Sequence, residues 1–280
     1  MNDDVELRGQ QPIGRRRALQ FGGLGLGSAA AGFGVRAATE SSFVTPGQLS
    51  TRSNVAPEIV ERRGSSRIIW SVNTAAQRVA ITFDDGPDPD FTPRALAALA
   101  AVGGRGTFFM MGYNVETHAE LARRVVNEGH EIATHTSEHR YLPFLAPADT
   151  GEQIADGFAA VKKLGDVRWF RPPRGGLTGA VVLAANDLDL DIAMWSVNGR
   201  IGKDESSADL AIRIGSTIQR GDIVLFHDGI GRGTFQPQTS FAQELRDRRG
   251  KELDALPRVL EQLTDSGFEL VTVSELVEDE

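Results

Sequence analysis

The feature that most constrains this chain is a strand that ends in two adjacent carboxylates. The run 79–83 alternates apolar and other residues, which predicts a strand with one buried face. Asp84 and Asp85 follow at its end, and Gly86-Pro87 then turns the chain away. Neighbouring carboxylates repel each other, so both stay ionised only beside a cation or hydrogen-bond donors. The segment therefore indicates either an Asp-rich turn or a site where one Asp binds a metal and the other acts as a base.

Two histidines four residues apart supply partners for the acidic pair. The chain has five histidines and no cysteine, and His135 and His139 follow a second strand-like run, 130–134. On one helical turn this spacing would bring both imidazoles to one face, close enough to share an ion. Two His and one Asp leave coordination positions open for water or substrate, which is typical of a catalytic metal site.

Three further segments place polar or aromatic side chains in turns or at strand ends. They are Phe170-Arg171-Pro172-Pro173-Arg174-Gly175, Asp191-Ile192-Ala193-Met194-Trp195 and Ile223-Val224-Leu225-Phe226-His227. Taken singly, the first is typical of a surface turn and the other two of core strands.

Taken together, the five segments resemble the motifs of a known family. TFDDGP (82–87), HTSEH (135–139), RPPRG (171–175), DIAMW (191–195) and IVLFH (223–227) follow the motif order of the polysaccharide deacetylases. These form the NodB-homology domain of carbohydrate esterase family 4. The resemblance covers about residues 75–275. It implies an α/β fold, a distorted (β/α)7-type barrel in a single domain, and removal of acetyl groups from an N- or O-acetylated polysaccharide.

The resemblance implies a metal site and a general base. Asp85, His135 and His139 would bind a divalent metal, most often zinc in this family, and the ligand set also tolerates cobalt or manganese. Asp84 would be the general base, held ionised and oriented by Arg171. Such a metal lowers the pKa of bound water and polarises an acetyl carbonyl.

The resemblance assigns the remaining motif positions to proton donation and substrate binding. His227 would be the general acid, with Asp191 as its supporting carboxylate. Leu225 and Trp195 would line a small apolar pocket for the acetyl methyl group. Arg174 stands where the family usually has Tyr; its backbone N–H would still serve the oxyanion, but the lost ring leaves the sugar specificity open.

Short strand-like runs alternate with helix-like stretches, which predicts a parallel sheet that closes, or nearly closes, into a barrel. The predicted strands are 79–83, 107–111, 130–134, 168–170, 189–195, 223–226 and 269–273. The predicted helices include 93–101, 116–127, 151–164, 208–219 and 253–266. Most candidate site residues follow strand ends, where such barrels place their sites. The stretch 229–250 is predicted to be a long polar loop that forms a wall of the substrate groove.

The first 37 residues are predicted to be a twin-arginine-type export signal. Arginines at 15–17 precede a weakly apolar Gly/Ala run at 21–31, and residues 35–37 resemble an A-x-A cleavage site. A disordered basic N-terminus is the alternative. The run is too weak for a membrane span, so we expect no stable membrane anchor and a periplasmic, cell-wall or secreted protein. Residues 38–74 are predicted to be a linker.

The charge of the chain restricts its partners. The net charge is −8 at pH 7, and the first 37 residues contribute five basic and three acidic side chains, so the remainder carries −10. Nucleic acids and anionic lipids favour basic surfaces, so neither is expected as a partner. An acetylated polysaccharide that is neutral or cationic is compatible with this charge.

Two other functions remain open from the sequence. The same scaffold could carry a catalytically silent glycan-binding protein, since a fold does not fix a function. A barrel hydrolase of another amide bond would keep the metal but reject sugars. Acetate release measured with and without a chelator separates the first alternative from a deacetylase.

Overall fold

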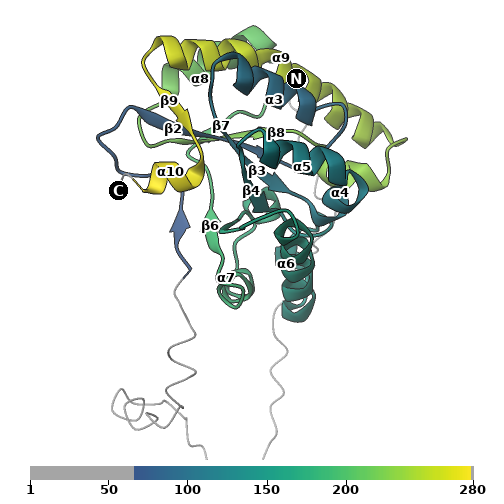
Figure 1. Ribbon diagram of the computed structural model, residues 1–280. Coiled ribbons are helices and arrows are strands. Elements are labelled where there is room, and N and C mark those ends of the chain that lie inside the picture. Colours follow the sequence, from purple (N-terminus) through teal and green to yellow (C-terminus); the bar gives the residue numbers. More distant parts are fainter. Residues whose placement is uncertain (1–65, 279–280) are drawn as a thin grey trace, which may run out of the picture. The chain divides into compact units, whose positions relative to one another are not determined.

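Residues 66–278 are described by a computed structural model, in which nine strands form one sheet (Figure 1). The strands are β1 (Ile68–Ile69), β2 (Arg78–Asp84), β3 (Thr107–Met110), β4 (Glu131–Thr134), β5 (Trp169–Phe170), β6 (Asp191–Ala193), β7 (Val197–Asn198), β8 (Ile223–His227) and β9 (Glu269–Val271). Their order is β1-β6-β5-β4-β3-β2-β8-β7, and β9 pairs with β2. Every pair of neighbouring strands runs parallel.

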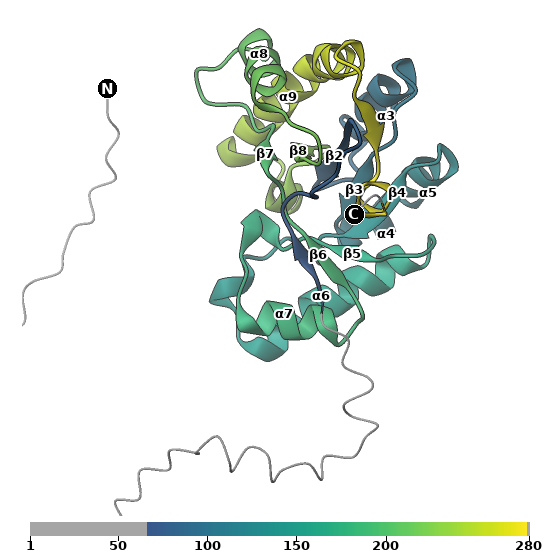
Figure 2. The same cartoon turned by 90° about the vertical axis from the view of Figure 1, so that its left-hand side faces the viewer.

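The connection between β6 and β7 shows that this sheet is curled. The two strands lie six strand positions apart in the order, which would separate them by about 29 Å in a flat sheet. Only residues 194–196 join them. The four-residue step from Ala193 to Val197 spans at most about 14 Å even when the chain is fully extended. The sheet must therefore bend round on itself, as Figure 2 shows. The predicted α/β single domain with a distorted barrel is confirmed.

The barrel begins earlier in the chain than predicted. β1 pairs with β6, and Val72 is buried, so residues 68–72 belong to the fold and not to a linker that extends to residue 74. The predicted export signal and residues 38–65 of the predicted linker lie outside the described residues. At the other end, α10 continues to Val277, which is also buried.

Eight α-helices of residues 66–278 cover the outside of the sheet. They are α3 (Thr92–Ala101), α4 (Gly112–Thr117), α5 (Ala119–Asn127), α6 (Pro147–Lys162), α7 (Gly179–Asn186), α8 (Ser207–Thr217), α9 (Ser240–Asp265) and α10 (Val273–Val277). Short 3-10 turns form η2 (Leu142–Phe144), η3 (Pro173–Gly175) and η4 (Gly231–Phe235). Figure 1 shows α3, α8 and α9 together at one side of the sheet, and α6 and α7 at the other. None of the helices in this part of the chain is long and apolar enough to cross a bilayer.

The prediction of a long polar loop at 229–250 is wrong. Most of it folds as η4 and the first turns of α9. Thr239 is the N-cap of α9, because its hydroxyl oxygen accepts a hydrogen bond from the backbone N–H of Ala242. Apolar periodicity does not predict the start of this helix, because its inward face carries Arg249 and Glu252, two charged residues that are buried as a pair.

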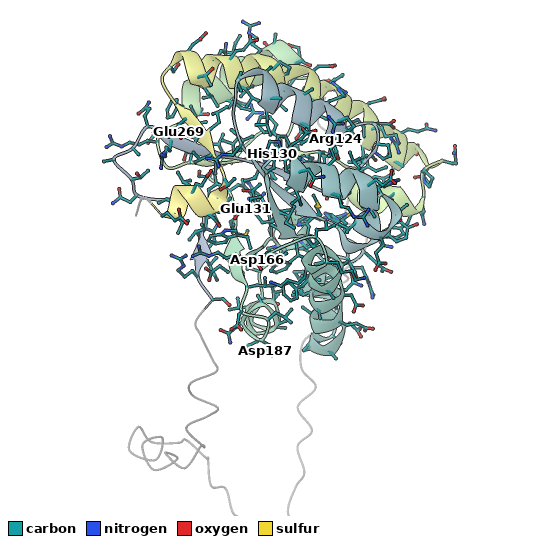
Figure 3. All side chains as sticks on the ribbon, in the orientation of Figure 1. Arg124, His130, Glu131, Asp166, Asp187 and Glu269 are labelled. Carbon is teal, nitrogen blue, oxygen red and sulfur yellow. The ribbon has the colours of Figure 1, made fainter. Side chains whose placement is uncertain are left out.

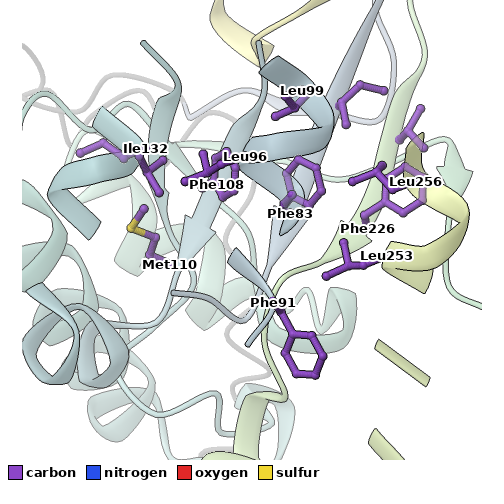
Figure 4. Packing of buried hydrophobic residues seen from close by; sticks show 14 of the residues in the cluster. Phe83, Phe91, Leu96, Leu99, Phe108, Met110, Ile132, Phe226, Leu253 and Leu256 are labelled. Atoms are coloured by element: carbon purple, nitrogen blue, oxygen red, sulfur yellow. The ribbon is translucent and has the colours of Figure 1, made fainter. Parts of the chain in front are cut away.

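The core is built on aromatic side chains from the central strands. The rings of Phe83 and Phe108 stack with centroids 4.8 Å apart, and the Phe83 and Phe226 centroids are 6.1 Å apart. Leucines of α3 and α9 pack in the same cluster (Figure 4). This packing fixes β2 against β3 and β8, and these strands end at the candidate site.

The C-terminal helix is tied to the sheet through Glu131 (Figure 3). Its carboxylate accepts a hydrogen bond from the Thr107 hydroxyl at 2.7 Å and another from the Ser274 hydroxyl, and Trp169 Nε1 donates to Ser274 Oγ at 2.9 Å. Burial raises the pKa of Glu131, and the hydrogen bonds from Ser274 and Thr107 oppose that rise. Glu131 is the first residue of β4, so this hydrogen-bond network lies at the end of the barrel opposite the candidate site.

Candidate active site

Eight of the ten residues predicted for the site line one cavity of about 430 Å³. They are Asp84, Asp85, His135, His139, Arg174, Trp195, Leu225 and His227. The other two behave differently: Arg171 is fully buried beside the cavity, and Asp191 lies elsewhere. The site is therefore assembled at the C-terminal ends of the strands, as expected for a barrel of this type.

Asp85, His135 and His139 form a cluster suited to a metal ion. One ligand atom from each residue lies within 4.8 Å of the others. Asp85 Oδ1 is 3.1 Å from His139 Nε2 and 3.6 Å from His135 Nε2. The carboxylate follows β2 and both imidazoles follow β4, so strands on either side of β3 hold the cluster.

The two histidines do not share a helical turn, contrary to the sequence-based expectation. They occupy a loop after β4 in which Thr136 and His139 have φ values of 68° and 54°. Asp85 and Arg174 also have positive φ, at 78° and 57°. Non-glycine residues rarely adopt this conformation, and strain of this kind concentrates at functional sites. The left-handed residues bring the two imidazole centroids to 5.0 Å of each other.

Helix α6 supports this loop at a position where only glycine fits. A Cβ on Gly157 would lie 2.3 Å from the carbonyl carbon of Thr136 and 2.7 Å from its Cα. The backbone N–H of Ser137 also donates to the carbonyl of Gln153 on the same helix, at 2.9 Å. The histidine loop is therefore in direct backbone contact with α6.

We expect Gly157→Ala to lower the free energy of unfolding by about 1–3 kcal/mol, because the new methyl group must displace the histidine loop or the helix. Urea denaturation measures this change, and metal titration should show weaker binding. Gly151→Ala on the same helix is the matched control. A Cβ there meets no atom within 4 Å, so the substitution should stabilise the protein by about 0.5–1 kcal/mol. Equal effects at both positions would contradict the proposed support.

The protonation states of the cluster fit a divalent cation. Burial lowers the pKa of His135 to about 4, although the charge of Asp84 opposes the shift, so this imidazole is neutral near pH 7. Its Nδ1–H donates a hydrogen bond at 2.7 Å to the carbonyl oxygen of Arg171, which leaves Nε2 facing the cluster. Burial raises the pKa of Asp85, but the charges of His139, His227 and Arg249 outweigh that effect and lower it.

Two buried atoms of the cluster lack the hydrogen bonds that buried polar atoms normally make. Asp85 Oδ1 and His139 Nδ1 are buried, and neither has a hydrogen-bond partner among the described residues. A cation beside Asp85 would satisfy its free carboxylate oxygen. Together with the borderline character of a carboxylate and two imidazoles, this supports a fit to zinc or a similar ion.

Asp84 is held by a fully buried arginine. Arg171 Nη1 donates to Asp84 Oδ1 at 2.7 Å and to the Thr82 hydroxyl at 2.9 Å. Its other donors reach the carbonyl oxygens of Ala193 and Met194 at 2.8 Å each. The guanidinium thus fixes the Asp84 side chain from β2, and the Asp84 Oδ2 atom lies 3.7 Å from His135 Nε2, at the edge of the cluster.

His227 is held by Glu252, a residue that the sequence reasoning missed. His227 Nδ1 lies 2.8 Å from Glu252 Oε1, and Glu252 is fully buried. Arg249 Nη1 donates to the second oxygen of this carboxylate at 3.1 Å. Because Nδ1 is occupied, the other ring nitrogen of His227 is the one available to the cavity.

The predicted pairing of Asp191 with His227 is wrong. Asp191 accepts hydrogen bonds from the backbone N–H and Nε of Arg67 at 2.9 and 3.3 Å, and from Arg168 Nε at 3.4 Å. Asp191 begins β6 whereas His227 ends β8, and in a parallel sheet these positions lie at opposite edges. Asp191 therefore has a structural role near β1.

Arg249 connects the acidic ligand with the support of His227. Besides Glu252, it donates to Asp85 Oδ2 at 3.3 Å and to the carbonyl oxygen of Gly229 at 3.0 Å. Arg249 and Glu252 lie three residues apart on α9; Arg249 falls within the predicted loop at 229–250, and Glu252 lies just after it. The buried apolar residues Ala242, Leu253 and Leu256 follow a helical period, but the charged Arg249 and Glu252 between them interrupt the apolar pattern.

Apolar and cationic side chains form the walls of the cavity. Trp195 and Leu225 lie where the resemblance places the acetyl pocket, with Phe241 and Leu245 of α9 also in the lining. Gly175 permits this arrangement, because a Cβ there would lie 2.9 Å from the Trp195 ring.

Comparisons with known proteins agree with this geometry. The polysaccharide deacetylase family model matches residues 71–193. A peptidoglycan-N-acetylglucosamine deacetylase of Bacillus cereus is 33% identical over 213 residues, which cover 75% of this chain and 92% of the relative. The chain belongs to the polysaccharide deacetylase family. The first three motifs fall inside the region that the family model matches. The DIAMW segment runs past its end at residue 193, and His227 and α9 lie beyond it.

Two solved structures illustrate the range of this family. The Bc1960 peptidoglycan N-acetylglucosamine deacetylase superposes with a TM-score of 0.66 at 26% identity, covering 80% of this chain and 97% of the other. A carbohydrate esterase family 4 pseudoenzyme from Bacillus anthracis superposes with a TM-score of 0.64 at 23% identity, covering 77% and 70%. The second likeness shows the fold alone, so activity must be argued from the site residues of this chain.

Proposed function

We propose that this protein is a metal-dependent deacetylase that removes acetyl groups from an N- or O-acetylated polysaccharide. One observation carries the proposal: the Asp84 carboxylate, the Asp85-His135-His139 cluster and the His227 imidazole line a single cavity. Asp84 is oriented by Arg171, and His227 by Glu252. Perturbed and mutually oriented titratable groups in a cavity are typical of hydrolytic active sites.

Asp85, His135 and His139 would hold the cation. A divalent metal, with zinc favoured by this ligand set, would supply Lewis-acid activation of water and of the acetyl carbonyl. The chain contributes a neutral His135, whose Nδ1–H is fixed by the Arg171 carbonyl, and an ionised Asp85. These side chains are thus already in the protonation states that metal ligands need.

The proton transfers would be divided between Asp84 and His227. Asp84 accepts the proton of the attacking water, and Arg171 keeps the carboxylate turned toward the reacting group. His227 then gives a proton to the departing sugar nitrogen or oxygen, while Glu252 stabilises the imidazolium form before the transfer. Trp195 and Leu225 would enclose the acetyl methyl group and exclude water from that side.

Acetate release tests this function directly. Purified protein loaded with zinc should release acetate from at least one of chitin-like oligomers, peptidoglycan glycan strands and acetylated xylan. A chelator should abolish the release and added zinc restore it. His135→Ala and His139→Ala should each lose bound metal by elemental analysis. Absence of acetate release by the folded, metal-loaded protein would favour the silent glycan-binding alternative, and full metal occupancy in either variant would remove that residue from the ligand set.

A further inference from the structure

One buried side chain touches three parts of the candidate site. Arg249 lies in the wall of the cavity with 5% of its surface exposed. Its Nε donates to the carbonyl oxygen of Gly229 at 3.0 Å, its Nη1 to Glu252 Oε2 at 3.1 Å and its Nη2 to Asp85 Oδ2 at 3.3 Å. A guanidinium is costly to bury unless opposite charges and hydrogen-bond acceptors surround it. Arg249 is therefore an internal connection between these groups, with all three of its side-chain nitrogen atoms engaged.

The contact with Asp85 fixes the direction of a candidate metal ligand. Asn114 Nδ2 donates to the main-chain oxygen of Asp85 at 2.8 Å, and Arg249 holds Oδ2 of the side chain. The other oxygen, Oδ1, lies 3.1 Å from His139 Nε2 and has no hydrogen-bond partner among residues 66–278. Ligating carboxylates are oriented by outer contacts of this kind. Arg249 therefore turns Oδ1 of Asp85 toward the histidines.

The contact with Glu252 secures the carboxylate behind the proposed general acid. Glu252 is fully buried, and its Oε1 lies 2.8 Å from His227 Nδ1. Arg249 donates to Oε2, the other oxygen of the same carboxylate. A buried carboxylate without a positive partner is strongly disfavoured. Glu252 therefore depends on Arg249 both for its charge and for the direction in which it faces His227.

The contact with Gly229 places the main chain of η4 against the cluster. A Cβ on Gly231 would lie 3.2 Å from both Asp85 Oδ1 and His139 Nδ1, and Gly231 has a φ of 51°. Glycine suits both this close approach and this backbone conformation. Gly231 follows Gly229 by two residues, so the hydrogen bond from Arg249 holds the start of η4 beside the cluster.

We propose that Arg249 is a positioning residue that aligns the candidate metal ligand Asp85 with the general acid His227 through one guanidinium. The inference rests on the proposed function for the acid, and on the cluster alone for the metal. An arginine suits this task because its planar group presents donors in fixed directions, whereas a lysine ammonium is a single point of charge. Loss of Arg249 should therefore disturb both metal binding and proton donation, whereas loss of Glu252 should disturb only the second.

Zinc affinity tests the contact with Asp85. The measurement is a calorimetric titration of zinc into protein from which metal has been removed. We expect Arg249→Gln to bind zinc about 10–100-fold more weakly, which is the loss typical of a removed outer partner of a ligand. Glu252→Gln should stay near the wild-type affinity, since the contacts of Glu252 are with His227 and Arg249.

A double-mutant cycle tests the path from Arg249 to His227. The readout is kcat for an acetyl amide divided by kcat for an activated acetyl ester, both at saturating zinc. Arg249→Gln and Glu252→Gln should each lower this ratio by about tenfold, as the loss of one charge-assisted contact allows. In the double variant the ratio should fall no further than in Glu252→Gln, while zinc affinity should fall as in Arg249→Gln. The double variant removes both charges of the buried pair, so it carries the test if Arg249→Gln does not fold.

Two further variants separate positioning from charge alone. Arg249→Lys returns the charge without the fork, so it should recover at most one of the two quantities, zinc affinity or the amide-to-ester ratio. Recovery of both would overturn the inference. Arg248→Gln is the control, because Arg248 is the neighbouring residue of α9 and its ion pair is with Glu244. It should keep the wild-type zinc affinity and ratio, and equal effects in Arg248→Gln and Arg249→Gln would also overturn the inference. Circular dichroism of each variant checks that it is folded.

The outcomes separate this inference from the proposed function. Acetate release with unchanged zinc affinity in Arg249→Gln, or with a further fall of the ratio in the double variant, would overturn the inference and leave the deacetylase intact. Absence of acetate from every substrate would reject the deacetylase. In that case zinc affinity still decides the role of Arg249, and equal affinities of Glu252→Gln and the double variant would overturn it.

Discussion

Asp84→Asn should retain metal but lose turnover by about 10²–10⁴-fold, the loss expected when a general base is removed. Asn keeps the size of the side chain and still accepts a hydrogen bond from Arg171, which lies 2.7 Å from Asp84 Oδ1. It cannot take a proton from water at neutral pH. The measurement is acetate release by protein whose metal content has been determined by elemental analysis.

Asp85→Ala provides the contrast. Asp85 belongs to the cluster suited to a metal ion, so this variant should lose both metal and activity. The two adjacent aspartates therefore give different results in the same pair of assays. A folded, metal-loaded Asp84→Asn protein with near-normal turnover would show that the base is another group.

His227→Ala should slow amide substrates by about 10²–10⁴-fold and an activated acetyl ester far less. The amide nitrogen must be protonated before it leaves, whereas the activated ester has a leaving group that needs no proton. Glu252→Gln should give the same substrate pattern at a smaller amplitude, because the glutamine can still contact His227 Nδ1 but brings no charge. The readout is the ratio of amide to ester kcat.

Asp191→Asn is the matched control for Glu252→Gln. Asp191 pairs with Arg67 and Arg168 at the far edge of the sheet, so its substitution should leave the amide-to-ester ratio unchanged. Equal losses on amide and ester in His227→Ala would show that His227 positions substrate or structure. A change in the ratio in Asp191→Asn would contradict the assignment of Glu252 as the supporting carboxylate.

The parts of the site that could be predicted from the sequence are those fixed by strand ends. Asp84, Asp85 and His227 directly end or follow apolar runs, and parallel strands bring their C-terminal ends to one edge. The order of the strands, however, depends on long-range pairing that periodicity does not report. The resemblance pairs Asp191 with His227, although the strand of Asp191 presents it at the opposite edge of the sheet.

The predictions failed where charged residues are buried in pairs. Arg249 and Glu252 make the inward face of α9 look solvent-exposed in the sequence, because burial of each depends on the other. The same difficulty applies to the histidine loop. It has positive φ values at Thr136 and His139 and packs on α6, a helix that starts eight residues later in the chain, and local periodicity reports neither feature.

The pairing of β2 with β8 has a consequence for how proteins of this architecture can diversify. Asp84 and His227 are register partners in adjacent parallel strands, so the spacing of the two groups follows from the backbone ladder, at about 4.8 Å between strands. Arg174, Arg200 and Arg232, in contrast, lie outside the two paired strands. Substitution, insertion or deletion in those connections would change the lining of the cavity while the ladder keeps Asp84 and His227 in place. The residues proposed to remove the acetyl group and the residues that line the rest of the cavity are therefore held by separate parts of the chain.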